Sequence, residues 1–357
     1  MNKKLKVGII GVGNIAQCHI HGYKNNENVE LYAFCDLDKE KLEKNGKRHG
    51  VTHLFTDYNE MLKLPELDMV SVCTWNAAHA ECSIAALNAG KHVLCEKPMA
   101  MNEAEAIKMK EAADKSGKLL MIGFVRRYGD DCNTVLNLKE CGEIGDFYYG
   151  KVTYLRRNGN PEGWFGDKSL SGGGPLVDLG VHVIDLSRYL MGNPKPVSVY
   201  GATFRKLFNR PHIKSEKAYR SSTNVKELVC DVEDMATALI RYDNGAVIAV
   251  ETSFSLDVKE PSGKIELFSD KGGIIIDPNV TLCKDRFGYM TNQTFDAPTS
   301  LDSISFDELF AREINHFTDC VLGKAECKAP AEDGVVVMRI LDGIYKSAET
   351  GHEVIIG

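Results

Sequence analysis

Residues 5–16 read LKVGIIGVGNIA, and this stretch decides the fold of the first part of the chain. Its apolar beginning, residues 5–10, is typical of a strand buried in a parallel sheet. Gly11, Gly13 and Ala16 then form a GxGxxA turn, and a helix-compatible segment follows. Glycine at position 11 allows a tight turn, glycine at 13 lets a ligand approach the backbone, and a small residue at 16 lets helix and strand pack closely. The stretch therefore predicts a strand, a tight turn and a helix whose N-terminus attracts negative charge.

A second apolar run, Val29–Cys35, ends at Asp36, 25 residues after Gly11. An acidic residue at about this interval suits the ribose hydroxyls of a dinucleotide, so the whole pattern predicts dinucleotide binding. The alternative is an ordinary strand–turn–helix that needs glycine. Asp36 favours NAD over NADP, because a carboxylate repels a 2′-phosphate and no arginine follows at once.

Strand and helix candidates continue to alternate along the chain. We expect strands at 68–74, 91–95 and 118–124, and helices at 77–88 and 103–116. This alternation predicts an α/β Rossmann domain, with a parallel doubly wound sheet, over residues 1–124.

Polar side chains gather where these strands end. Ligands of such sheets bind beyond the carboxyl ends of the strands, which share one edge. We therefore expect a cofactor to contact side chains from that edge. The candidates are Thr74, Asn76, His79, Glu96, Lys97 and Arg126.

After about Phe124 the pattern changes to long alternating runs. They lie at 147–157, 197–205, 234–242, 246–255, 264–269 and 273–277, and the sequence DNG at 243–245 indicates a tight hairpin between two of them. We predict a second domain over residues 125–357, an α+β domain with a large, mainly antiparallel open sheet. Further helices are expected at 305–321 and 332–349, and whether the C-terminal helix packs back on the first domain is left open.

Apolar side chains occupy both alternate sets along 235–240 and 247–250, so both faces of this sheet need cover. A second subunit is the simplest cover, which predicts a homodimer or homotetramer joined through the C-terminal sheet. The polar segment 207–230 could form a lid, an arm that embraces a neighbouring subunit or a plain surface loop, and the sequence does not distinguish these alternatives.

Residues 172–192 read GGGPLVDLGVHVIDLSRYLMG and predict a helix with Pro175 in its first turn and Gly192 at its end. Most of its circumference is apolar, which is typical of a buried helix. The polar residues Asp178, His182, Asp185 and Tyr189 fall on one line. This stripe faces either solvent or a reaction site.

Composition limits the classes of partner. The chain has 357 residues and a formal net charge of -7, which argues against nucleic acid and anionic membranes as partners. Its 11 cysteines show no CxxC and no metal-ligand spacing, so we expect no metal and reduced intracellular thiols. No apolar stretch is long enough to span a bilayer, and we expect a soluble cytoplasmic protein.

Several motifs together resemble one family. They are the GGGPxxDxGxHxxD helix, the segment CTWNAAHAECSIAALNAGKHVLCEKPMA at 73–100 and the sequence GFVRRY at 123–128. With the N-terminal dinucleotide motif, they resemble the glucose-fructose oxidoreductase / inositol dehydrogenase (Gfo/Idh/MocA) family over essentially the whole chain.

The resemblance implies roles for individual residues. Thr74 and Asn76 would lie near the ribose and nicotinamide of the cofactor, Glu96 would contact the nicotinamide ribose, and Pro98 would follow a cis peptide. One departure is Trp75, where the family commonly has proline, and it makes the contacts of its two neighbours less certain. The residues that would hold the rest of the cofactor are Gly11, Gly13, Asn14, Ile15 and Asp36.

The resemblance also implies that Lys97 orients and activates a reacting hydroxyl, with Asp178 and His182 completing the catalytic site. An imidazole titrates near neutral pH, which suits His182 to acid–base catalysis, while a lysine ammonium would orient and stabilise developing charge. The reverse assignment of these two roles stays open.

Arg156 and Trp164 precede the glycine-rich turn and would line the far side of a substrate pocket, unless Trp164 is a buried loop anchor. Aromatic faces and hydrogen-bonding side chains suit a polyhydroxylated ring. We expect an NAD-dependent dehydrogenase or reductase of a sugar, glycoside or cyclitol such as inositol. Lys97, Asp178 and His182 would also contact this substrate. The alternatives are an enzyme that cleaves glycosides while recycling NAD, and a non-catalytic NAD-binding regulator.

Overall fold

The structure, a computed structural model, describes residues 4–207, 210, 212–213, 220–221, 229–298 and 306–357. The chain divides into two compact units. Unit 1 comprises residues 1–125 and 305–335, and unit 2 comprises residues 126–304 and 336–357. Most of the segment 207–230 lies outside the described residues, as does Ser305, the first residue of an expected helix.

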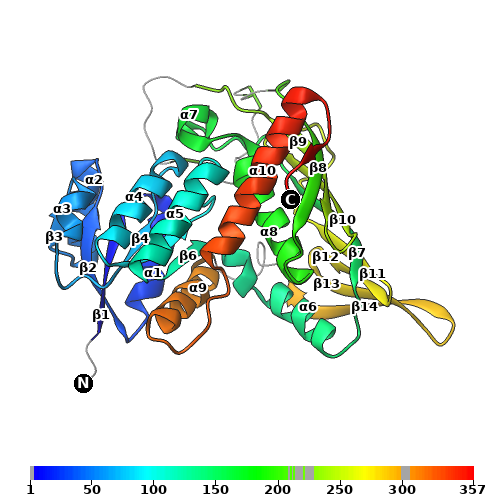
Figure 1. The fold of residues 1–357 in the computed structure, drawn as a ribbon, viewed down its shortest axis with the longest axis horizontal. Coiled ribbons are helices and arrows are strands. Elements are labelled where there is room, and N and C mark those ends of the chain that lie inside the picture. Colours follow the sequence, from blue (N-terminus) through cyan, green and yellow to red (C-terminus); the bar gives the residue numbers. More distant parts are fainter. Residues whose placement is uncertain (1–3, 208–209, 211, 214–219, 222–228, 299–305) are drawn as a thin grey trace. The chain divides into compact units, whose positions relative to one another are not determined.

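Unit 1 contains a six-stranded parallel sheet in the order β3-β2-β1-β4-β5-β6 (Figure 1). This is the strand order of doubly wound dinucleotide-binding sheets, and it confirms the predicted Rossmann fold. The strands are β1 (Leu5–Ile10), β2 (Val29–Cys35), β3 (His53–Phe55), β4 (Met69–Val72), β5 (His92–Glu96) and β6 (Leu120–Gly123). The helices are α1 (Asn14–Lys24), α2 (Lys39–His49), α3 (Tyr58–Leu62), α4 (Asn76–Asn88), α5 (Glu103–Ser116) and α9 (Phe306–Val321).

Helix α9 belongs to unit 1 although it lies late in the sequence. It packs on α1, where the ring of Phe310 contacts that of His19, with ring centroids 5.5 Å apart. This packing buries Glu313, which lies on α9, to 0% exposure. A part of the chain far from the nucleotide motif therefore contributes to the core beneath it.

Unit 2 contains a nine-stranded sheet in the order β14-β13-β12-β11-β7-β10-β9-β8-β15. Neighbouring strands are antiparallel except for the parallel pair β7 and β10, which confirms the predicted, mainly antiparallel sheet. The strands are β7 (Phe147–Leu155), β8 (Pro196–Phe204), β9 (Met235–Tyr242), β10 (Val247–Ser253), β11 (Ile265–Ser269), β12 (Gly272–Ile276), β13 (Asn279–Arg286), β14 (Tyr289–Pro298) and β15 (Val354–Ile355).

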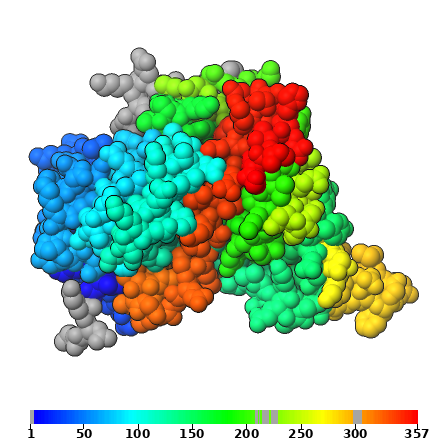
Figure 2. Space-filling view, in the orientation of Figure 1, coloured from blue at the N-terminus to red at the C-terminus, as the bar shows by residue number. Residues whose placement is uncertain are grey.

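The helical elements that follow β6 are η1 (Val125–Tyr128), α6 (Asp130–Glu140), η2 (Gly163–Gly166), α7 (Lys168–Ser171), η3 (Leu176–Gly180), α8 (Val181–Leu190) and α10 (Ala331–Thr350). Helix α8 and the π-helical η3 contact strands of the nine-stranded sheet. The hairpin of β13 and β14 projects from the body of unit 2, as Figure 2 shows in yellow-orange.

Large apolar side chains of unit 2 remain exposed on neighbouring strands. Tyr200 on β8 is 51% exposed and Leu239 on β9 is 49% exposed, and the two are directly paired across the strands. Tyr148 on β7 is 60% exposed. In the part of the chain that the structure describes, no helix combines the length and the apolarity that crossing a membrane requires.

Candidate active site

The turn after β1 has the geometry of a phosphate-binding loop. Gly11 adopts a φ of +86°, and a Cβ at this position would lie 2.6 Å from the carbonyl oxygen of Cys73. Gly13 is extended and caps the N-terminus of α1. The positive φ and this close contact require glycine at position 11, and a glycine turn that leads into the N-terminus of α1 fits the pyrophosphate of a dinucleotide.

Asp36 is fixed beside this turn at the end of β2. Its Oδ2 accepts a hydrogen bond from the Val12 N–H at 2.8 Å, and its Oδ1 accepts one from the Asp38 N–H at 2.9 Å. The Lys41 ammonium lies 3.1 Å from Oδ2. No sequence pattern indicates this ion pair, because Lys41 reaches Asp36 only once α2 has formed.

The ends of β4 and β5 are joined by a buried histidine. One ring nitrogen of His79 lies 2.7 Å from the Pro98 carbonyl oxygen and the other 3.2 Å from that of Thr74. Burial lowers the pKa of His79, which favours its neutral form. Asn76 begins α4 and is buried, and Thr74 is half-buried. The cis peptide expected before Pro98 is confirmed.

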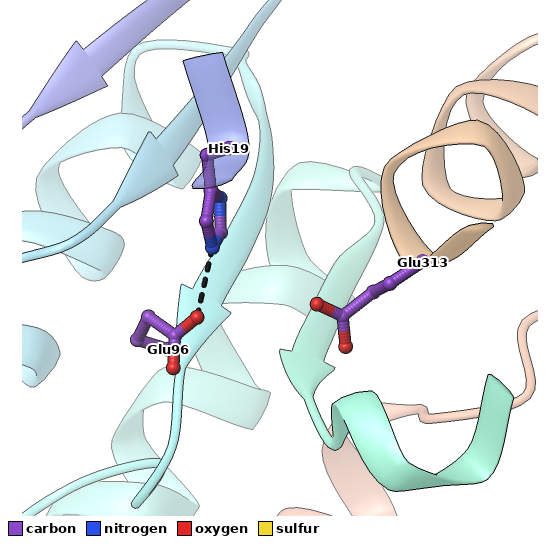
Figure 3. A group of neighbouring side chains, drawn as sticks. All are labelled: His19, Glu96 and Glu313. Carbon is purple, nitrogen blue, oxygen red and sulfur yellow. Dashed lines mark hydrogen bonds and ion pairs between the residues drawn. The ribbon is translucent and has the colours of Figure 1, made fainter. Parts of the chain in front are cut away.

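Glu96 ends β5 and is only 5% exposed. Its Oε1 lies 2.8 Å from Nε2 of His19 (Figure 3). Its Oε2 accepts a hydrogen bond from the Lys97 N–H at 3.2 Å. Lys97 itself is half-buried. In unit 1, the candidate cofactor residues that follow β1, β2, β4 and β5 thus lie at the same edge of the sheet.

In unit 2, the helix predicted over 172–192 begins with the π-helical turn η3 and continues as α8. Asp178 lies in the π-helical turn and His182 in the first turn of α8. Both are half-buried, as is Tyr189, while most other residues of these two elements are buried. π-Helical turns are frequent at functional sites.

Asp185 differs from the rest of the predicted polar stripe. Its carboxylate is buried and accepts two hydrogen bonds from the Arg127 guanidinium, at 3.0 and 2.5 Å. The same guanidinium lies over the Tyr189 ring, 4.4 Å from its centroid. This bidentate pair leaves Asp178 and His182 as the acidic and basic groups of the helix that solvent reaches.

The start of this helix is held by Glu233, a residue that the sequence analysis did not identify. Its buried carboxylate accepts hydrogen bonds from the N–H groups of Gly174 and Leu176, at 2.9 and 3.2 Å, and from the Tyr345 hydroxyl at 2.9 Å. A Cβ at Gly173 would overlap the Tyr345 hydroxyl, and one at Gly174 would overlap the backbone of Glu233. This close packing explains the glycines of the turn.

The remaining candidates of unit 2 lie on three other segments. Arg126 is 2% exposed, and its guanidinium lies 3.6 Å from the Asp131 carboxylate. Arg156 follows β7 and donates to the Gly159 carbonyl at 3.2 Å. Trp164 is half-buried, and its ring stacks on that of Phe165 at a centroid distance of 3.9 Å.

A dinucleotide-binding Rossmann unit, followed by a unit with an open antiparallel sheet, defines a class of NAD-binding oxidoreductases. Residues 5–124 match the family model described as "Oxidoreductase family, NAD-binding Rossmann fold", GFO_IDH_MocA. Residues 139–356 match its C-terminal alpha/beta domain. The chain therefore belongs to the Gfo/Idh/MocA family of oxidoreductases, as its motifs predicted.

Similar proteins cover nearly the whole chain. D-glucoside 3-dehydrogenase of Escherichia coli is 33% identical over 354 residues, which are 98% of this chain and 97% of that protein. Myo-inositol 2-dehydrogenase of Thermotoga maritima is 28% identical over 273 residues, 76% of this chain and 75% of that protein. The structure of levoglucosan dehydrogenase in complex with NADH has a TM-score of 0.85 at 24% identity, covering 99% of this chain and 100% of that one.

The geometry at Gly11 predicts the effect of one added methyl group. We expect Gly11→Ala to weaken NAD binding by about tenfold or more, because the new Cβ meets the Cys73 carbonyl and the residue requires a positive φ. Gly50→Ala is the matched control, since Gly50 also has a positive φ but nothing lies within 4 Å of its added Cβ. Fluorescence titration with NAD measures both. Equal affinities in the two variants would contradict the assignment of this turn.

Proposed function

We propose that this protein is an NAD-dependent dehydrogenase that oxidises a ring hydroxyl of a sugar, or reduces the corresponding ketone, with D-glucosides as the first substrates to test. The full-length similarity to D-glucoside 3-dehydrogenase supports this substrate class. The observation that carries the chemistry is the half-buried pair Asp178 and His182 on a largely buried helix.

Oxidation of an alcohol requires a hydride acceptor and a base for the hydroxyl proton, and NAD, when bound, supplies the acceptor. In this proposal the His182 imidazole takes the proton. The Lys97 ammonium orients the hydroxyl and stabilises the negative charge that develops on its oxygen. Asp178 holds the imidazole or binds a neighbouring sugar hydroxyl. Lys97 comes from unit 1, and Asp178 and His182 come from unit 2.

Two further side chains of unit 2 suit a sugar. The indole of Trp164 stacks on Phe165 and remains partly exposed, so it can offer a face to the C–H groups of a sugar ring. Arg156 is also half-buried and supplies donors for hydroxyl oxygens. We propose both as substrate-binding residues.

The catalytic assignment predicts the effect of two substitutions. We expect Lys97→Ala and His182→Ala each to lower kcat by about 100-fold or more. His182→Ala removes the group that takes the hydroxyl proton, and Lys97→Ala removes the group that stabilises the negative charge on the hydroxyl oxygen. The assay is NADH absorbance with a panel of glucosides, free sugars and inositols. Exposed residues of the same types provide the controls Lys39→Ala and His352→Ala.

If both site variants turn over like the parent, the catalytic assignment is wrong. NADH that accumulates with the substrate consumed supports a dehydrogenase. Turnover without net NADH indicates glycoside cleavage with NAD recycling, and NAD binding without turnover on any substrate indicates a regulator.

Asp36 predicts the choice between NAD and NADP. Its carboxylate is fixed by the Val12 and Asp38 amides, where it would bind ribose hydroxyls and exclude a 2′-phosphate. We expect Asp36→Ser to raise the ratio of kcat/KM for NADP over NAD by about tenfold or more, because Lys41 then lacks its anionic partner. A parent enzyme that already prefers NADP would refute this role.

We also propose that the protein is a homodimer or homotetramer joined through the nine-stranded sheet. The exposed pair Tyr200 and Leu239 on adjacent strands supports this interface. We expect Leu239→Asp to dissociate the oligomer, because it places a charge in an apolar contact. Leu322→Asp, in unit 1, is the control. Sedimentation equilibrium measures the mass, and a parent that sediments as a monomer would exclude the interface.

A further inference from the structure

Three ionisable side chains meet in the core of unit 1. His19 comes from α1, Glu96 from the end of β5 and Glu313 from α9, and their exposures are 0%, 5% and 0%. Figure 3 shows the hydrogen bond between His19 and Glu96, with the Glu313 carboxylate directed toward the same space. One ligand atom from each residue lies within 4.8 Å of the other two. We call these three residues the acidic cluster.

The surrounding hydrogen bonds orient the imidazole. Nδ1 of His19 lies 3.2 Å from the Ser71 hydroxyl, which in turn lies 2.7 Å from the Tyr23 hydroxyl. Burial raises the pKa of Tyr23, so its phenol keeps its proton. When Tyr23 donates to Ser71 and Ser71 donates to Nδ1, the His19 Nε2–H donates to Glu96. In this arrangement Glu96 accepts the hydrogen bond and the imidazole donates it.

The cluster contains two carboxylates and one imidazole, so it carries two negative charges when both carboxylates are ionised and the imidazole is neutral. It stays negatively charged until it has taken up two protons. A charge in a buried, low-dielectric setting acts over several ångströms. Glu96 also lies at the sheet edge where the proposed cofactor site is built.

We propose that the acidic cluster stabilises oxidised nicotinamide relative to reduced nicotinamide. The oxidised ring carries a positive charge that the reduced ring lacks, so a fixed negative charge beside it favours binding of NAD+ over NADH. This inference rests on the proposed function and on the contact between Glu96 and the nicotinamide ribose that the family resemblance implies. The cluster would act on the cofactor's equilibrium, with Glu313 as a positioning and charge-bearing residue rather than a catalytic one.

The field of the cluster already affects neighbouring groups at this edge. Burial is the main cause that raises the pKa of Cys73, and the charges of Glu96 and Glu313 raise it further. The carbonyl of Cys73 is the group that faces Gly11 in the phosphate turn. Glu96 likewise opposes the effect of burial on the pKa of His79. Cys73, which follows β4, and His79, on α4, therefore lie within the electrostatic reach of Glu96.

The experiment compares dissociation constants of NAD+ and NADH for the full-length protein and its variants, by calorimetry or fluorescence titration. We expect Glu313→Gln to weaken NAD+ binding by about threefold to tenfold and to change NADH binding by less than about twofold. Glu313→Asp keeps the charge and should preserve the parent ratio. Glu308→Gln makes the same charge change on an exposed position of α9 and is the control.

If the ratio of the two constants stays at the parent value in folded Glu313→Gln, the inference is overturned. Should that variant not fold, Glu313→Met makes the same charge change with an apolar side chain of similar length. A divalent cation held stoichiometrically by the parent and lost in the variant would also overturn it, because the cation would cancel the charge. If the parent binds neither nucleotide, the proposed function itself is refuted. If the parent binds both, and the ratio of the two dissociation constants is the same in Glu313→Gln, only this inference is refuted.

Discussion

Polar groups buried at the ends of apolar elements must find partners, and this requirement shapes both units. In unit 2 the carboxylate of Glu233 accepts two helix-start N–H groups and the Tyr345 hydroxyl, where an unpaired buried N–H would cost free energy. The turn can pack against Tyr345 and Glu233 only because Gly173 and Gly174 lack side chains. The orientation of the helix that carries His182 therefore depends on residues far away in the sequence.

The need to pair buried polar groups also divides the polar residues of that helix into buried structural ones and partly exposed ones. Asp185 lies one turn beyond His182, but its carboxylate is buried and paired with Arg127 through two hydrogen bonds. A buried pair of this kind is costly to break, since removal of one partner leaves an uncompensated charge. Asp178 lies at the other end, in the π-helical turn, and remains half-buried. The polar stripe thus combines an anchor with groups that a ligand can reach.

The sequence predicted those helices and strands that are marked by residues within or next to the element itself. Strands β1 and β2 and helix α5 have the predicted bounds, because each combines an apolar run with clear turn or capping residues. Strands β13 and β14 were not predicted, since their stability comes from pairing in the sheet and not from a strong alternation of their own. The partners Glu233 and Glu313 were missed for the same reason: each meets its site only through tertiary folding, and no spacing in the sequence records that contact. Lys41 was missed because it reaches Asp36 only through the turn and helix that follow β2.

The two acidic positions at the edge of unit 1 differ in what their charge can do. Asp36 lies 3.1 Å from the Lys41 ammonium, and its carboxylate accepts hydrogen bonds from the Val12 and Asp38 amides. Glu96 accepts its hydrogen bonds from an imidazole and a backbone amide, neither of which carries a full positive charge when His19 is neutral. Its field therefore extends beyond its immediate partners. In our proposals, the first carboxylate excludes a 2′-phosphate and the second responds to the charge of the nicotinamide.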